Sequence, residues 1–138
     1  MTVAINDAQI VVQTAIYNAL TSNSYISANS IGVFDMVPKG TPTPFITIGD
    51  MTVVDNSTAG IGGQVITLQI HSWTQDLSSS RLKTMMANVI TALHDQKLTL
   101  GAGYNNVNTR FVNSQVFKDP DGLTQHGIQK FRIVVENL

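Results

Sequence analysis

The final twenty residues constrain the fold more than any other segment. Residues 119–122 read Asp-Pro-Asp-Gly, a combination typical of a tight turn between two strands. After this turn the sequence alternates between apolar and polar side chains, as an extended chain with one buried face does. The apolar positions are Phe131, Ile133 and Val135, and the polar positions are Lys130, Arg132 and Glu136. The pattern predicts a long antiparallel strand whose two faces differ in character.

Residues 64–73 show the same alternation, so we expect a second long strand there. Its predicted core face carries Ile66, Leu68 and Ile70, and its other face carries Val65, Thr67, Gln69, His71 and Trp73. A shorter strand is expected near residues 31–37. Three prolines between residues 38 and 44 exclude a helix or central strand and predict a stiff loop that leads into a strand from Phe45.

Two segments have helical periodicity. In residues 82–93 large apolar side chains recur every three or four positions, and Asp76 or one of the serines at 78–80 can cap the helix. A weaker pattern runs from Asn6 or Asp7 to about Leu20. The order of elements predicts an α+β fold: a mainly antiparallel sheet with two helices packed on one face, formed by residues 1–138 as a single domain.

Two segments are predicted to be loops. Residues 55–63 read DNSTAGIGG and offer almost nothing to bury, so we expect a mobile loop. The Gly- and Asn-rich residues 101–108 are also expected to form a loop, followed by a strand at about 110–118.

The composition points to a protein with covered surfaces. Charged residues make up 12% of the chain, about half of the ~25% usual in soluble domains, which favours a surface shared with partners over a soluble monomer with a neutral polar surface. The eight basic residues are scattered singly along the sequence, which argues against sequence-specific nucleic-acid binding. There is no membrane-spanning apolar run and no pattern of a signal peptide, so we expect synthesis in the cytoplasm of a bacterial host.

No catalytic or metal-binding motif is present. The absence of cysteine excludes disulfides and thiolate metal ligands, and none of the three histidines has a second ligand at metal spacing. The turn at 119–122 departs from a calcium loop at later ligand positions, and the glycines at 60, 62 and 63 lead into a strand rather than a phosphate-binding helix. The sequence predicts no catalytic residue, no metal and no cofactor.

Three segments together carry a family resemblance. The first is the proline-bounded loop that begins at Pro38, together with the strand that follows it as far as Ile48. The second begins at Gly62-Gly63 and comprises the strand that ends in His-Ser-Trp at residue 73 and the helix after it. The third is Asp-Gly-Leu-Thr at 121–124, then His126-Gly127 and the terminal strand. In this order and spacing the chain resembles the tail-terminator (tail-completion) proteins of long-tailed bacteriophages.

The resemblance implies a structural protein rather than an enzyme. It implies a ring, usually of six copies, that sits on the finished tail tube at the head-proximal end of the virion tail and stops its polymerisation. The implied partners are further copies of the chain, the tail tube protein and the head–tail connector protein, with DNA passing through the ring without sequence-specific binding. A neighbouring connector or stopper protein and a small-molecule-binding regulatory α+β domain are the alternatives.

The candidate interface lies in two places, the glycine-rich loop and the polar sheet face. It comprises Asp55, Asn56, Gly60, Gly62, Gly63, Gln69, His71, Trp73, Lys130 and Arg132. In the competing interpretation, Trp73 packs under its own loop and the polar face is simply in contact with water.

Overall fold

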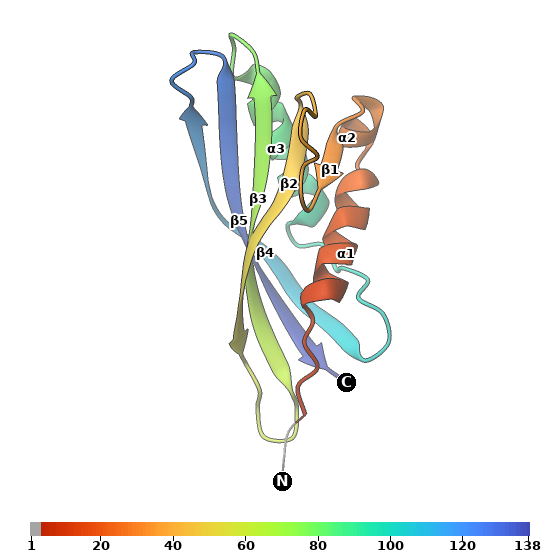
Figure 1. The fold of residues 1–138 in the computed structure, drawn as a ribbon. Helices are drawn as coiled ribbons and strands as arrows, with labels where there is room; N and C mark the ends of the chain where they lie inside the picture. Colours follow the sequence, from red (N-terminus) through yellow and green to blue (C-terminus); the bar gives the residue numbers. More distant parts are fainter. Residues whose placement is uncertain (1–3) are drawn as a thin grey trace.

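The fold is a strongly twisted five-stranded sheet with three helices on one of its faces (Figure 1). The computed structural model describes residues 4–138. The helices are α1 (Gln9–Thr21), α2 (Ser24–Ala28) and α3 (Ser80–Leu93). The strands are β1 (Gly32–Phe34), β2 (Phe45–Asp55), β3 (Gly63–Gln75), β4 (Tyr104–Lys118) and β5 (Thr124–Asn137), in the sheet order β1-β2-β3-β5-β4.

The predicted α+β class is confirmed, with two corrections. The pair β1–β2 is parallel, so the sheet is mixed although every other pair is antiparallel. Residues 4–138 form three helices rather than two, because the polar residues that end α1 also start α2. The side chain of Asn23 accepts hydrogen bonds from the backbone N–H groups of Tyr25 and Ile26, at 3.0 and 3.1 Å. This cap supports a short helix that buries Ile26.

The core lies between the helices and the sheet face predicted to be apolar. All six residues assigned to that face are fully buried: Ile66, Leu68, Ile70, Phe131, Ile133 and Val135. The helix α3 contributes Met85, Val89 and Leu93 to the same cluster, and α1 contributes Val12, Ile16 and Leu20. The alternation in β3 and β5 therefore assigned the two faces correctly.

Strand β4 begins earlier than expected, and residues 104–108 are not a loop. The buried Asn106 explains the difference, because its side chain satisfies four polar partners. Its Oδ1 accepts from the Leu98 N–H at 2.8 Å and the Thr109 hydroxyl at 3.1 Å, while its Nδ2 donates to the carbonyls of Asn108 and Val134. A polar residue can therefore lie inside this strand without an unpaired group.

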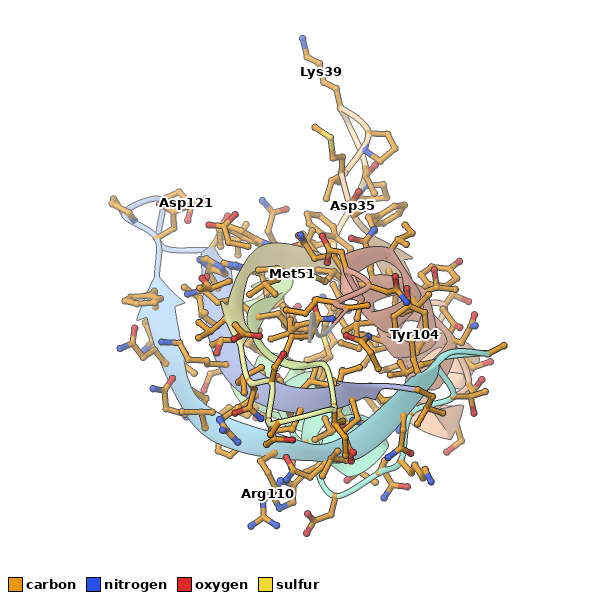
Figure 2. The ribbon with its side chains drawn as sticks, turned by 90° about the horizontal axis from the view of Figure 1, so that it is seen from below. Asp35, Lys39, Met51, Tyr104, Arg110 and Asp121 are labelled. Carbon is orange, nitrogen blue, oxygen red and sulfur yellow. The ribbon has the colours of Figure 1, made fainter. Side chains whose placement is uncertain are left out.

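The connections of the long strands lie at opposite ends of the molecule. The β2–β3 connection, residues 56–62, lies near both chain ends, while the turn at 119–123 lies at the other end of the sheet (Figure 1). The loop that carries Lys39 stands out from the body of the protein (Figure 2).

Candidate functional site

A row of rings crosses the polar face of the sheet near the 119–123 turn, with one ring from each strand. Its members are Phe34 on β1, Phe45 on β2, Trp73 on β3, His126 on β5 and Phe117 on β4. The centroids of neighbouring rings are 6.3 Å apart for Phe34–Phe45, 6.3 Å for Phe45–Trp73, 3.7 Å for Trp73–His126 and 6.1 Å for His126–Phe117. We call this set the aromatic row. It is partly exposed, so it forms a surface rather than a core.

His71 lies directly beside the row and bonds to it. Its Nδ1 lies 2.7 Å from Nε2 of His126, close enough for one nitrogen to donate and the other to accept. Room for the His71 ring comes from Gly49, since a Cβ there would lie 2.7 Å from His71 Nε2. Burial lowers the pKa of both rings; that of His126 falls to about 4, with the neighbouring His71 as the second cause. Both rings are therefore mostly neutral at pH 7, and in that state one ring can donate its N–H to the unprotonated nitrogen of the other.

Basic side chains that are far apart in the sequence lie together lower on the same face. Arg110 on β4 is the register partner of Arg132 on β5, and Lys130 is two residues along β5. Asp95 offsets one of these charges, since its Oδ1 lies 2.8 Å from Nη1 of Arg110. Arg110 extends away from the body of the protein (Figure 2). Arg110, Lys130 and Arg132 thus lie near one another in the fold, although the basic residues are scattered along the sequence.

The predicted sheet-face residues lie where the alternation placed them. Gln69 is opposite Lys130, and Trp73 is opposite His126. Gln69, His71, Trp73 and Lys130 are half-buried, and Arg132 is exposed. The ring of Trp73 lies against those of Phe45 and His126 on the neighbouring strands.

The predicted loop residues lie at the other end of β3, about 33 Å away at 3.3 Å per residue over ten residues. Asp55 is the last residue of β2, and its carboxylate accepts from the N–H and hydroxyl of Ser57 at 3.2 and 2.7 Å. Asn56 donates its backbone N–H to Gly63 O at 2.9 Å. Gly60 is exposed, with a φ of +89° that favours glycine. The connection is thus a compact, hydrogen-bonded hairpin turn.

Gly62 and Gly63 are a correction to the candidate interface, because both are buried inside the subunit. A Cβ on Gly62 would collide with the backbone oxygen of Ala4, and the Gly62 carbonyl accepts from the Asn137 N–H at 2.8 Å. These glycines allow the N-terminal segment and the end of β5 to approach the hairpin. They have a packing role, and the exposed residues of the connection are Asn56 and residues 58–61.

Four members of the aromatic row were not among the residues predicted from the sequence: Phe34, Phe45, His126 and Phe117. The pairing of His126 with Phe117 could have been predicted, because counting outward from the hairpin turn places these two residues opposite each other. No comparable signal existed for Phe34 and Phe45, because β1 and β2 are parallel and joined by an irregular loop.

The third histidine, His94, has a structural role. His94 Nδ1 accepts the backbone N–H of Phe111 at 3.0 Å, and the Asp95 N–H donates to Thr109 O at 2.9 Å. Together they cover part of the outer edge of β4, which would otherwise present unpaired backbone groups. Within residues 4–138, no group of three or more His, Asp or Glu side chains could hold a metal ion. No helix in the described part of the chain is long and apolar enough to cross a membrane.

Comparison with known proteins decides the family. Residues 14–136 match the family model described as tail completion protein gp17. The chain belongs to the tail completion protein gp17 family. The tail completion protein gp17 of Bacillus phage SPP1 is 31% identical over 99 residues, which cover 72% of each chain. The resemblance to tail-completion proteins found in the sequence is thereby confirmed, and a structural role in phage tail completion follows.

Solved structures show the same fold. A chain in the virion of a native gene transfer agent particle matches with a TM-score of 0.82 and 25% identity, over 91% of this chain and 94% of that one. The structure of bacteriophage SPP1 gp17 matches with a TM-score of 0.61 and 24% identity, over 91% of this chain and 88% of that one. As a tail completion protein, this chain is a structural component of a phage particle.

Proposed function

We propose that this tail completion protein forms a closed ring on the head-proximal end of the tail tube, with residues 1–138 acting as one unit. The ring stops the addition of tube subunits and offers the head–tail connector a surface on which to dock. Six copies are the number that the family resemblance implies, and DNA passes through without sequence-specific contacts. The protein acts by association and has no catalytic turnover and no cofactor.

The aromatic row is the observation that supports this proposal most. Trp73 and its neighbours place aromatic side chains on a partly exposed sheet face, and aromatic residues are enriched among those that dominate binding energy at interfaces. The rings touch one another across all five strands, so the surface is held rigid before a partner arrives. Rigid aromatic surface lowers the entropy lost on binding.

A second observation is that the two candidate surfaces lie at opposite ends of the subunit. The aromatic row lies near the 119–123 turn, and the hairpin 56–62 lies beside the chain termini (Figure 1). A protein that joins a tube to a connector needs two different surfaces facing opposite ways along the particle. We assign the two ends of the sheet to these two partners.

Omitting the protein during phage assembly tests the proposal. Without a terminator, tails should vary in length and fail to join heads, because nothing ends polymerisation. Supplying the wild-type protein in trans should restore both properties, whereas Trp73→Ala should restore them poorly. Tails of normal length joined to heads in the absence of the protein would contradict the proposal.

The same experiment separates the closest alternative. If the chain is instead a neighbouring connector or stopper protein, its omission should leave tails of uniform length that remain unattached to heads. Tail length, measured on electron micrographs, therefore distinguishes the two functions.

A further inference from the structure

We infer that the exposed side of α1 in one copy is covered by the outer end of β4 from the next copy. This inference rests on the proposed ring and names the two surfaces that close it. Four features of the subunit support it: the composition of α1, a hollow beside it, the unsupported end of β4, and the match between the last two.

The outer face of helix α1 carries polar side chains, among them Gln9, Thr14 and Asn18, but no charged one. None of its thirteen residues is charged, and its exposed side presents Ile10, 68% exposed, and Tyr17, 46% exposed. By contrast, the exposed positions of α3 include Lys83. An uncharged surface that mixes large apolar with polar side chains is typical of protein–protein interfaces, in which charged residues are depleted. The outer side of α1 is therefore suited to being covered in the assembled state.

A hollow of about 150 Å³ lies beside Tyr17. Its walls are Gln13, Thr14 and Tyr17 of α1, Ile48 of β2, and Asp35, which follows β1. Asp35 is the charged residue of this lining, and it forms no ion pair with any other residue of 4–138. The hollow thus offers a small apolar side chain a place beside an uncompensated carboxylate.

The end of β4 has the complementary character. Every residue of 112–118 is exposed, because α3 covers β5 but does not extend over this half of β4. Phe111 is the last residue of β4 whose N–H is bonded on the outer edge, by His94. Among the described residues, no backbone bond other than those to β5 involves 112–118. Such an open edge, carrying Val116 and Phe117, favours pairing with another chain.

Val116 and Lys118 match the hollow in both shape and charge. Their register partners, Gly127 and Gln125, are buried on the helix side of the sheet, so both side chains face that side. Valine is small enough to contact Tyr17 and Ile48, while Lys118 lies two residues further on, within reach of Asp35 of the neighbouring copy. Lys118 is the charged residue of the 112–118 segment, and it makes no ion pair within residues 4–138.

The two surfaces also lie on separate flanks of the subunit. Helix α1 and the end of β4 are on opposite sides in Figure 1, and Asp35 and the hairpin tip at Asp121 are well separated in Figure 2. A contact between two different patches of identical subunits repeats around an axis and can close into a ring. An isologous dimer would instead need each patch to contact itself.

Disulfide trapping tests this contact directly, since the chain contains no cysteine. A Thr14→Cys, Val116→Cys double variant, assembled on purified tail tubes and oxidised, should give a ladder of cross-linked species that ends at the full ring. Either single variant should give no ladder. A matched control, Lys83→Cys with Val116→Cys, places the first cysteine on α3 and should not form a ladder either.

Charge reversal provides an independent test. Asp35→Lys or Lys118→Asp alone should weaken ring formation by about tenfold or more, because like charges would then meet across the contact. The Asp35→Lys, Lys118→Asp double variant should recover most of the loss, and Lys83→Asp should have no effect.

The outcomes distinguish this inference from the proposed ring. Wild-type rings that form on tubes while the cysteine pair gives no ladder, or while the charge variants assemble normally, would overturn the contact and leave the ring standing. Failure of the wild-type protein to form any ring on tubes would overturn both.

Discussion

Trp73 and His126 stack face to face across β3 and β5, with ring centroids 3.7 Å apart and planes inclined by 7°. The two residues are register partners, so the stack is a direct consequence of strand pairing. His126 also bonds to His71, which lies two residues before Trp73. The three side chains therefore join the two central strands of the aromatic row into one rigid unit on which the proposed assembly surface depends.

The histidine pair predicts a loss of stability in acid. The folded state holds the pKa of His126 at about 4, below the 6.5 of a free histidine, so the unfolded chain binds more protons between these values. The free energy of unfolding should therefore fall as the pH drops from about 6.5 towards 4. Because the ring is partly exposed, screening limits the loss to about 1 kcal/mol. Denaturant unfolding at pH 7 and pH 5 measures it.

A His126→Phe variant is the control for this pH dependence. It keeps an aromatic ring in the row but cannot be protonated, so its stability should change less between pH 7 and pH 5 than that of the wild type. An equal change in the two proteins would show that His126 is not the group responsible.

Removing the central ring of the row should separate folding from assembly. Trp73→Ala loses a stack worth about 0.5–1.5 kcal/mol beyond its buried area, and since the ring is partly exposed the subunit should still fold. Association with tubes or connectors should drop sharply. Thermal unfolding measures the stability of each variant, and a binding assay with purified tubes or connectors measures association. Leu77→Ala, which removes an exposed apolar side chain elsewhere, is the control. Equal binding by the two variants would refute the assignment of the row as an interface.

Helix α3 should be a core element rather than a binding surface. Met86 is buried against Gly127, where any Cβ would collide with its sulfur. Met86→Asp would place an unpaired charge there and should cost about 3 kcal/mol or more, enough to unfold most of the protein. Circular dichroism measures this, with the exposed Lys83→Asp as control. A folded Met86→Asp protein that has lost binding would contradict this role.

The exposed part of the β2–β3 connection should become more protected in the assembly. The backbone N–H groups of Asn56, Thr58, Ile61 and Gly63 are already bonded within the subunit, so the gain should be largest at Ala59 and Gly60. Hydrogen exchange of the free protein and of the protein on tubes measures the difference. Equal protection in the two states would show that this hairpin does not meet a partner.

The sequence predicted those parts of the fold in which one pattern dominates. Alternation in β3 and β5 fixed their two faces, and the periodicity of 82–93 located α3, because burial of one face imposes each pattern. The sequence-based prediction was wrong where a polar residue can serve either in a loop or inside a helix or strand. Asn23 both ends one helix and caps the next, and Asn106 looked like a loop residue although its amide is satisfied inside β4.

The candidate site was predictable only in part, for a similar reason. The alternation assigned His71, Trp73, Lys130 and Arg132 to the polar face correctly, but a face does not reveal its cross-strand neighbours. The pairing of Trp73 with Phe45 and that of Arg132 with Arg110 depend on the register between β2 and β3 and between β4 and β5. Bulges on β2 and β4 shift that register, and the local sequence does not predict where they occur.

A reconstruction of the assembled particle that carries this chain would show whether a ring lies at the head-proximal end of the tail. We expect a single ring of copies at the joint between tail tube and connector, with the aromatic row and the 56–62 hairpin facing different partners. Copies placed along the tube or at its far end, or a finished particle without this protein, would contradict it.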